Sequence, residues 1–486
     1  MMGGQKMSKS DADQYVQRFV FYNLDAREVK RRHAEGYSDA TIKGAANIAL
    51  RSGRSLDYIL RRVTVSGEPL PLIASQLGVP TTAMNADIPG YGNGTINLES
   101  RGAMSGAATD PSLSNPDLGV ALATPVTNNA GPQTPPPDDL RTITPDEQAA
   151  FDRAAQQTLG RADAQMRAVL QAFQTLNPVP LFTLTPEEAR RRPTIADAVR
   201  TVQTQRNLPT TPEPVGNVRD TTITGPAGPV PVRVYTPAGT GPFPAIVYFH
   251  GGGFVFATID TYDASCRALA NAAQAVVISV EYRKAPENKL PAAHEDGYAV
   301  LQYVMNNGAE FGAEGTRVAV AGESAGGNLA ADLCLLARAR NGKMPVYQLL
   351  VYPIADGRSN RPSDRENRNA IALSAPLVDW FNFYIVPNPA FGQIPLVELG
   401  DRAPTAPVNG VALPPATVVL AELDPLRSEG QAYAERLQRG GVPVRTRVFS
   451  GVSHEFFGTG VVVDKGKQAV AFAAEGLRAA FKPANR

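Results

Sequence analysis

The feature that most constrains this chain is the pentapeptide GESAG at residues 322–326, a G-x-S-x-G pattern. The residues before it, 317–321 (RVAVA), are typical of a short buried strand, and the small residues from Gly327 onward are typical of a helix start. A serine on so sharp a strand-to-helix turn exposes its hydroxyl above the sheet, and the flanking glycines permit the close backbone approach that the turn needs. The pattern predicts that Ser324 is a nucleophile rather than an ordinary turn serine.

A serine hydroxyl is a weak nucleophile at neutral pH and needs a general base. Enzymes that hold the nucleophile on such a turn place the acid and then the base after it in the chain. Only His454 among the four histidines satisfies that order, in a loop after the strand-like run 444–449. His454 is therefore the predicted base. We interpret His250 as shaping its own loop by hydrogen bonding, and His294 as a solvated residue at a helix start.

The orienting acid is expected at the end of a strand that precedes the base. The run 416–423 (ATVVLAEL) is strand-like, and Asp424 and Pro425 follow it directly. Proline restricts the residue before it to extended geometry, which suits a carboxylate held rigidly in a tight turn. Asp424 is the predicted acid. Glu422 and Asp356 are its rivals, and a helix N-cap is the alternative role for Asp424.

An oxyanion site is indicated by HGGGF at residues 250–254, directly after the strand-like run 244–249. Consecutive glycines let backbone N–H groups converge on a developing negative charge, because no Cβ obstructs them. The N–H of Ala325, the residue after the nucleophile, is a second predicted donor.

These motifs together resemble those of the bacterial hormone-sensitive lipase-like esterases (family IV). The resemblance extends over about residues 150–486. It is carried by HGGG at 250–253, EYRKAPE at 281–287, LPAA at 290–293, GESAGG at 322–327, DPLR at 424–427 and H-x-F at 454–456.

The resemblance implies an α/β-hydrolase fold with a helical cap, and a carboxylesterase that acts on short- to medium-chain acyl esters without a metal or an organic cofactor. It implies a set of six site residues, namely the triad Ser324, Asp424 and His454 and the oxyanion donors Gly252, Gly253 and Ala325. The chain departs from the family pattern at Ser428, where an acidic residue is usual, and at Lys284, where an apolar one is usual. The role of Glu323, beside the nucleophile, stays open.

The composition along the chain predicts four parts. Residues 1–84 are predicted to be a small helical N-terminal domain, and residues 85–142, rich in Gly, Pro and Asn, a flexible linker. Residues 143–210 are predicted cap helices. Residues 211–486 are the predicted catalytic domain, in which the aromatic-rich segment 358–395 is a cap insertion.

Helix signals in the N-terminal part begin with Asp25 and with Ser38, a predicted N-cap, and a third amphipathic stretch opens at Ser55. Residues 73–79 resemble the first half of a helix-turn-helix. The following residues 80–84 contain no Arg or Lys, which base recognition normally uses. We therefore favour a packing or protein-interaction bundle over a DNA-binding module.

In the remainder, Thr144 and Thr185 each begin a helix with a capping box, and the first of these helices is predicted to run to Leu176. A hairpin is predicted from 219–224 and 230–235. Further strand-like runs alternate with helix-like segments, which predicts a mostly parallel sheet with helices on both faces. These runs are 244–249, 275–282, 317–321, 346–352, 416–422 and 443–449.

A formal net charge of +1 and an apolar content of 43% favour a globular enzyme over a polyanion-binding protein. No apolar run approaches the ~18 residues of a membrane span. The first residues have no apolar stretch typical of a secretory signal, so we expect a cytoplasmic protein. Cys266 and Cys334 are interpreted as buried free thiols. Expected partners are a small-molecule ester and, through residues 1–84, a second copy or another protein, but no nucleic acid.

Three other interpretations of the same residues stay open. In the first, the same triad acts on amides or lactones, or in acyl transfer. A binding protein on this scaffold is the second, as in the plant gibberellin receptors, which resemble this family but lack the catalytic histidine; the presence of His454 argues against it. The third is an enzyme that residues 1–84 attach to a target.

Overall fold

The computed structural model describes residues 37–52, 59–60, 63, 69–76, 81, 145–356, 361–385, 399 and 405–482. The chain divides into two compact units, each considered by itself. One comprises Met1–Ser114 and Val386–Ile394, and the other Asn115–Ile385 and Pro395–Arg486. The predicted linker, residues 85–142, lies outside the described residues.

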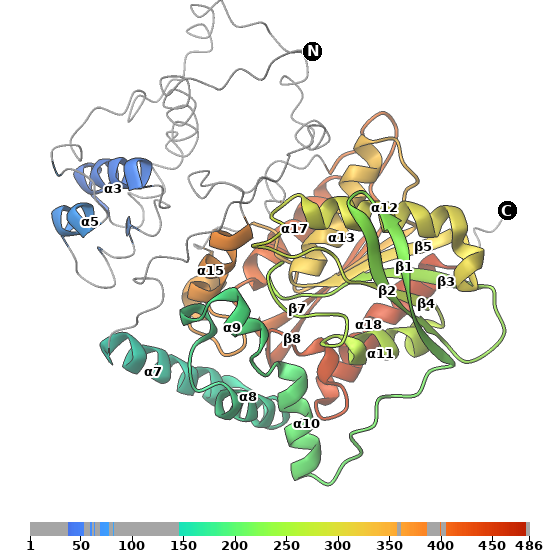
Figure 1. Cartoon of the computed structure of the whole chain (residues 1–486), viewed down its shortest axis with the longest axis horizontal. Helices are drawn as coiled ribbons and strands as arrows, with labels where there is room; N and C mark the ends of the chain where they lie inside the picture. The colour runs from blue at the N-terminus through green and yellow to red at the C-terminus, as the bar shows by residue number, and fades with distance from the viewer. Residues whose placement is uncertain are drawn as a thin grey trace, which may run out of the picture. The chain divides into compact units, whose positions relative to one another are not determined.

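The second unit is built on an eight-stranded sheet in the order β1-β2-β4-β3-β5-β6-β7-β8 (Figure 1). The strands are β1 Asn217–Gly225, β2 Gly228–Thr236, β3 Phe243–Phe249, β4 Val276–Val280, β5 Ala313–Glu323, β6 Tyr347–Val351, β7 Ala416–Leu423 and β8 Val444–Ser453. The β1–β2 and β2–β4 pairs are antiparallel, and the other five pairs are parallel. The predicted mostly parallel sheet is confirmed.

The hairpin that opens the sheet is also confirmed. Gly225 pairs with Gly228, so the turn is made by the two residues between them. Strands β3, β4, β6 and β7 are buried almost throughout rather than alternating; all five residues of β4 are buried, for example. Continuous burial of this kind requires cover on both faces of a parallel sheet.

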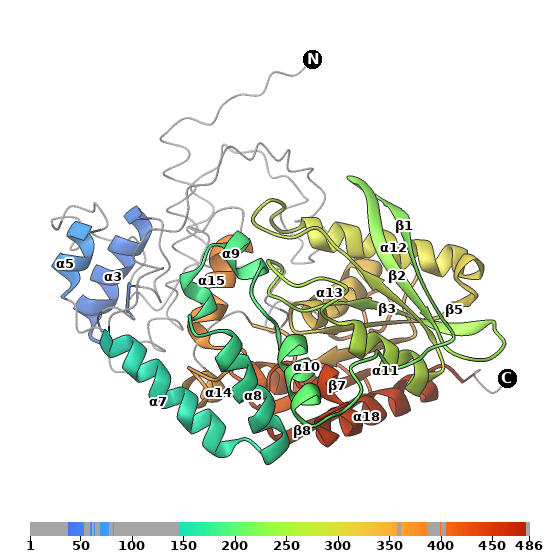
Figure 2. The same cartoon turned by 60° about the horizontal axis from the view of Figure 1, so that its bottom comes forward.

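Helices provide that cover. Figures 1 and 2 show α11 and α18 on one face of the sheet and α12, α13 and α17 on the opposite face. Their bounds are α11 Asp263–Ala273, α12 Ala292–Asn307, α13 Ala325–Ala339, α17 Arg427–Arg439 and α18 Asp464–Ala480, with the short 3-10 helices η6 Gly308–Phe311 and η7 Phe457–Thr459. The predicted α/β fold class is thus confirmed.

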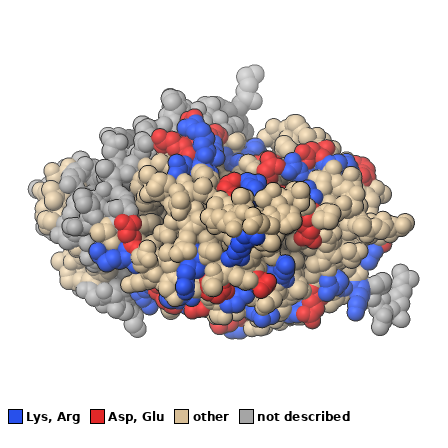
Figure 3. Space-filling view, turned by 90° about the horizontal axis from the view of Figure 1, so that it is seen from below, with Lys and Arg blue, Asp and Glu red and all other residues tan. Residues whose placement is uncertain are grey.

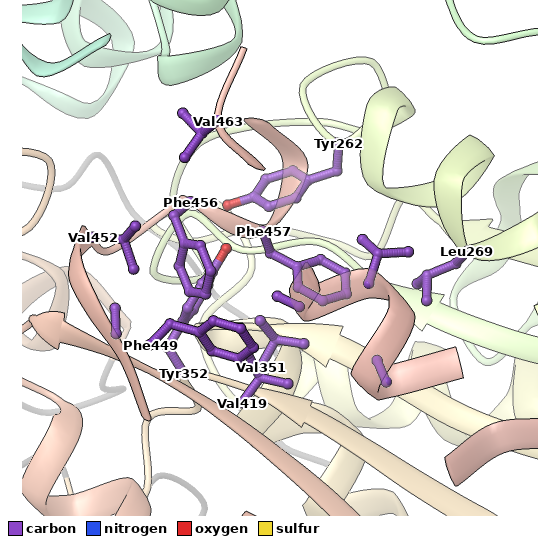
Figure 4. Packing of buried hydrophobic residues seen from close by; sticks show 14 of the residues in the cluster. Tyr262, Leu269, Val351, Tyr352, Val419, Phe449, Val452, Phe456, Phe457 and Val463 are labelled. Atoms are coloured by element: carbon purple, nitrogen blue, oxygen red, sulfur yellow. The ribbon is translucent and has the colours of Figure 1, made fainter. Parts of the chain in front are cut away.

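An aromatic cluster lies where β8 leaves the sheet (Figure 4). The ring centroid of Phe456 is 5.4 Å from that of Phe449 and 6.0 Å from that of Tyr352. Phe456 and the adjacent Phe457 are fully buried. Each buried side chain of this size contributes roughly 1.5–3 kcal/mol by leaving water. The loop just after β8 is therefore anchored on its own two phenylalanines.

The helices ahead of the sheet differ from the prediction in one respect. The structure has α7 Pro145–Arg161, α8 Ala164–Leu176, η5 Leu181–Thr183, α9 Pro186–Arg190 and α10 Ile195–Gln205. The prediction of a single helix as far as Leu176 is wrong, because the helix is interrupted between Arg161, the last residue of α7, and Ala164, the first residue of α8. Asp163 caps α8 there, and its Oδ1 accepts a hydrogen bond from the N–H of Met166 (2.8 Å). The capping box at Thr185 is confirmed.

Two helices occupy the described part of the predicted insertion 358–395. They are α14 Pro362–Glu366 and α15 Ala375–Ile385. Trp380 of α15 donates a hydrogen bond from its indole N–H to the carbonyl oxygen of Leu184 (2.9 Å), and its ring packs edge-on against those of Phe381 and Tyr384. The aromatic residues of the insertion therefore pack against the segment between α8 and α9.

The N-terminal unit contains α3 Asp39–Ser52 and α5 Leu70–Gln76. The predicted N-cap is confirmed, since the N–H of Thr41 donates to Ser38 Oγ (3.2 Å). A small apolar cluster joins these helices and consists of Ala45, Ile48, Ile59, Leu60, Ile73 and Ala74. The predicted helix beginning at Asp25 lies outside the described residues. So do residues 80–84, apart from Thr81.

Charge is evenly distributed on the face of the molecule shown in Figure 3, where basic and acidic side chains are interspersed. This agrees with the near-zero net charge. Among the described residues, no helix combines the length and apolar character that crossing a membrane requires.

Candidate active site

Ser324 occupies the sharp turn between β5 and α13 that the pentapeptide predicts. Its backbone has φ 57° and ψ −117°, a conformation that costs a non-glycine residue roughly 1–3 kcal/mol. The turn is held because the N–H of Ser324 donates to the carbonyl oxygen of Val351 (2.9 Å). A Cβ on Gly326 would lie 2.0 Å from the carbonyl oxygen of Phe249, and one on Gly322 would lie 2.1 Å from that of Gly326. Both glycines are therefore required by space.

The structure brings together the three side chains that were selected from distant parts of the sequence. His454 Nε2 lies 3.0 Å from Ser324 Oγ, and His454 Nδ1 lies 2.7 Å from Asp424 Oδ2. All three residues are at least 95% buried. The other carboxyl oxygen of Asp424, Oδ1, accepts a hydrogen bond from the N–H of Leu426 (2.8 Å). This fixes the carboxyl group within its own turn.

The rival carboxyl groups have other partners. Glu422 Oε2 accepts a hydrogen bond from the N–H of Gly451 (2.8 Å). Asp356 Oδ2 accepts one from Nε of Arg361 (2.9 Å). Asp424 is thus the carboxyl group that meets the imidazole of His454.

Two opposing effects act on the pKa of His454. Burial disfavours the charged imidazolium and by itself would lower the pKa. The carboxylate of Asp424, which attracts the imidazolium and accepts its Nδ1–H, raises the pKa, and together with Glu455 and Glu323 it outweighs burial. The net result is a pKa above the usual 6.5.

The glycine-rich loop after β3 has a conformation that only glycine adopts readily. Gly252 has φ +97° and Gly253 has φ +60°. A Cβ on Gly253 would lie 2.2 Å from the Phe381 ring, so that aromatic side chain packs directly on the loop. Ala325 is the first residue of α13, and its N–H is among those that a helix leaves without an intrahelical acceptor.

His250 begins this loop and plays the structural part expected of it. Its Nδ1–H donates to the carbonyl oxygen of Gly251 (2.7 Å), and its ring stacks on Tyr282 with centroids 4.3 Å apart. Tyr282 in turn donates from its hydroxyl to the carbonyl oxygen of His250 (2.8 Å). Burial lowers the pKa of His250 to about 4, which leaves a neutral ring at neutral pH.

Comparison with known proteins identifies the family. A family model for the α/β-hydrolase fold matches residues 246–458. Esterase LipI of Mycobacterium tuberculosis is 40% identical over 287 residues, which cover 57% of this chain and 87% of that protein. A solved esterase of Pyrobaculum calidifontis is similar with a TM-score of 0.56 and 36% identity, over 64% of this chain and 97% of that chain. The chain belongs to the α/β-hydrolase family.

Within that family it belongs with the hormone-sensitive lipase-like esterases. Ethyl acetate hydrolase of Pseudomonas putida is 31% identical over 307 residues, covering 62% of this chain and 92% of that protein. The α/β-hydrolase described here is therefore a carboxylic ester hydrolase.

The departure from the family at Ser428 is compensated within this α/β-hydrolase. Ser428 Oγ accepts a hydrogen bond from the N–H of Ser363 (3.1 Å), and the N–H of Ser428 donates to Ser363 Oγ (2.9 Å). Ser363 Oγ also donates to the carbonyl oxygen of Pro425 (2.5 Å). A serine pair thus supports the Asp424 turn. At the second departure, Lys284 donates to the carbonyl oxygen of Ala257 (2.7 Å).

Glu323 is a buried acid beneath the site whose role the sequence left open. Its Oε1 accepts a hydrogen bond from the hydroxyl of Tyr248 (2.5 Å), and its Oε2 accepts one from the hydroxyl of Tyr352. The Tyr352 ring lies 4.5 Å from that of His454, centroid to centroid. Burial, with a smaller contribution from Glu455, raises the pKa of Glu323 to about 7 against the lowering effect of its hydrogen bonds.

Glu455 is a further acid that sequence reasoning missed. Its backbone has φ +69°, which is uncommon for a residue with a side chain. Its Oε1 accepts a hydrogen bond from the Tyr262 hydroxyl (2.7 Å) and lies 3.8 Å from His454 Nε2. The H-x-F motif gave no signal, because any residue type satisfies its middle position.

The prediction of a solvated His294 is wrong. The residue is fully buried, its Nε2 lies 2.9 Å from Asp332 Oδ2, and its ring lies 5.7 Å from that of Phe254. A signal was present, because Gly297 and Leu301 follow His294 at helical spacing and share the buried face of α12. Cys266 and Cys334 are buried free thiols, as predicted.

The raised pKa of Glu323 gives a testable pH dependence of stability. Because its pKa in the folded enzyme (about 7) exceeds its usual 4.5, the neutral acid stabilises the fold at low pH, and this contribution is lost as the pH rises through about 7. Glu323→Gln stays neutral, so its free energy of unfolding should decrease less than that of the wild type between about pH 5 and pH 8. Urea unfolding followed by circular dichroism measures the difference.

A matched control is Glu435→Gln, which removes an exposed carboxyl group on α17. This variant should follow the wild type at both pH values. Parallel behaviour of Glu323→Gln and the wild type would show that Glu323 does not titrate abnormally.

Proposed function

We propose that the enzyme is a serine carboxylesterase that hydrolyses short- to medium-chain acyl esters through an acyl-enzyme intermediate, with Ser324, His454 and Asp424 as its catalytic triad. The observation that carries the proposal is the continuous hydrogen-bonded line from Asp424 through His454 to Ser324, with distances of 2.7 and 3.0 Å. Nucleophile, base and orienting acid have the mutual geometry that acyl transfer requires.

In the acylation step, Ser324 Oγ attacks the ester carbonyl carbon while His454 Nε2 takes the hydroxyl proton. The carboxylate of Asp424 accepts the Nδ1–H bond, which holds the imidazole in the required tautomer and stabilises the imidazolium. Backbone N–H groups of Gly252, Gly253 and Ala325 are assigned to the oxyanion, and removal of one such donor typically costs roughly 2.7–4 kcal/mol.

The proton on Nε2 then passes to the leaving alkoxide, which departs as an alcohol. Water enters, His454 removes one of its protons, and the resulting nucleophile attacks the acyl carbon. As the second tetrahedral intermediate collapses, the bond to Ser324 Oγ breaks, His454 returns its proton to that oxygen, and the carboxylic acid is released.

We assign α7–α10 (residues 143–210) and the described helices α14 and α15 of the predicted insertion 358–395 to a cap over the Ser324 pocket. Two contacts support this assignment. Arg190 of α9 donates to the carbonyl oxygen of Val255, next to the predicted oxyanion loop (2.8 Å), and Phe381 of α15 packs on Gly253. Bulky cap groups this close to the predicted oxyanion loop favour short acyl chains over long ones.

Replacement of the nucleophile tests the proposed chemistry. Ser324→Ala is expected to reduce kcat for p-nitrophenyl butyrate by roughly 10⁶-fold, the loss found when a triad serine is removed. Circular dichroism and the thermal midpoint should stay close to those of the wild type. Substantial hydrolysis by a folded Ser324→Ala protein would refute the assignment.

The pH profile tests the role of His454. Its raised pKa means that the imidazole stays protonated, and unable to act as a base, up to a higher pH than a free histidine. We expect kcat/KM to fall as the pH decreases, with a midpoint above 6.5. A profile that is flat down to about pH 4, where an ordinary histidine of pKa ~6.5 is fully charged, would contradict the assignment.

A chain-length series tests the substrate class. We expect kcat/KM for p-nitrophenyl esters to be highest for short and medium acyl chains and to fall for long ones. Phe381→Ala, which removes the ring over Gly253, should extend activity toward longer chains. A wild-type preference for long chains would contradict the proposed substrate class without touching the triad.

A further inference from the structure

Two backbone segments determine where the proposed acid and base lie: the turn at Asp424 and the residues just before His454. Asn367, which follows α14, donates from Nδ2 to the carbonyl oxygens of Asp424 (3.2 Å) and Glu422 (3.1 Å). The carboxylate of Glu422 accepts a hydrogen bond from the N–H of Gly451 (2.8 Å). One amide and one carboxylate therefore hold the two segments.

The guanidinium of Arg161, the last residue of α7, contacts both of these side chains. Its Nη1 donates to Asn367 Oδ1 (2.8 Å), and its Nη2 lies 3.5 Å from Glu422 Oε1. A guanidinium can only donate hydrogen bonds, so the contact with Oδ1 keeps Nδ2 of Asn367 directed at the two carbonyl groups. Nη2 also donates to Oε1 of Glu366 (2.6 Å). The other carboxyl oxygen of Glu366, Oε2, accepts a hydrogen bond from Nη2 of Arg427 (2.5 Å).

The corner between α7 and α8 touches the base-bearing segment directly. The N–H of Asp163 donates to the carbonyl oxygen of Gly451 (2.9 Å). Gly451 has φ +63°, and a Cβ there would lie 3.2 Å from the Asp163 nitrogen, so the two backbones are in close contact. The carbonyl and the N–H of Gly451 are thus held by Asp163 and by Glu422, both next to Arg161.

We propose that Arg161 is a positioning residue for ester hydrolysis, which holds Asn367 and Glu422 so that the acid and the base stay aligned with Ser324. The inference rests on the proposed function, because it requires that Asp424 and His454 are that acid and base. Arg161 acts through neighbours rather than on the substrate, so its loss affects kcat more than KM.

The central experiment compares Arg161→Ala with Arg153→Ala in the full chain. Arg153 is an exposed arginine on the same helix, which makes it a matched control for charge and helix propensity. For p-nitrophenyl butyrate we expect Arg161→Ala to lower kcat roughly 5- to 30-fold, within the ~10² that small misplacements of catalytic groups cost, and to change KM less than about two-fold. Arg153→Ala should match the wild type.

Chemical rescue separates positioning from a general structural effect. Arg161 lines a surface cavity of about 330 Å³ together with Asn367 and Glu366, so a free guanidinium ion has room to enter. Guanidinium chloride below denaturing concentrations should raise kcat of Arg161→Ala, whereas sodium chloride of equal ionic strength should not. Neither salt should raise kcat of Arg153→Ala.

A second variant keeps the inference testable if Arg161→Ala fails to fold. Asn367→Asp retains an acceptor for Arg161 but loses the donor to the Asp424 and Glu422 carbonyl groups, so kcat should fall as in Arg161→Ala. Unchanged kcat in Asn367→Asp would overturn the inference. So would unchanged kcat in Arg161→Ala, or an equal loss in Arg153→Ala.

Failure of this inference is distinguishable from failure of the proposed function. If Ser324→Ala retains activity, the proposed triad itself is wrong, whatever Arg161→Ala does. If a fluorophosphonate probe labels Ser324 and activity depends on it, while Arg161→Ala and Asn367→Asp hydrolyse the ester at the wild-type rate, only the positioning role of Arg161 is refuted.

Discussion

The close packing of the turn at Ser324 is the constraint on which the rest of the site depends. A serine with left-handed φ persists only where its surroundings impose it. Here β5 leads directly into the turn, the N–H of Ser324 bonds to the end of β6, and Gly326 packs beneath the carbonyl oxygen of Phe249 in β3. Three adjacent parallel strands thus fix one hydroxyl group. The ends of β7 and β8 then have to bring a carboxylate and an imidazole to it.

Both of those ends also depend on contacts with other parts of the fold. The Asp424 turn depends on the Ser363–Ser428 pair and on Asn367, and the segment after β8 depends on the burial of Phe456. The acidic residue usual in the family at position 428 is therefore replaced by hydrogen bonds from α14, an element of the insertion. The segment that supplies Phe381 over the glycine loop, residues 361–385, therefore also supports the Asp424 turn.

The features of the fold that the sequence predicted correctly have local signals along the chain. The turn at Ser324 and the hairpin closed by Gly225 and Gly228 each depend on the residue types of a few neighbouring positions. The helix break at Asp163 was also local, but a continuous apolar pattern across α7 and α8 hid it. Contacts such as that between Arg161 and Asn367, 206 positions apart, have no pattern along the chain, because neither residue type is unusual where it stands.

Three acids, Asp424, Glu323 and Glu455, lie close enough to His454 to raise its pKa. Glu323 and Glu455 are both desolvated, and burial raises the pKa of each above its usual 4.5. Of the acids near the imidazole, Asp424 is the one that bonds Nδ1, with its Oδ2 2.7 Å away, whereas Oε1 of Glu455 lies 3.8 Å from Nε2. In the proposed mechanism, the imidazolium formed during attack is stabilised by Asp424 at Nδ1. Its Nε2–H is then directed at Ser324, where the proposed mechanism passes the proton to the departing alkoxide.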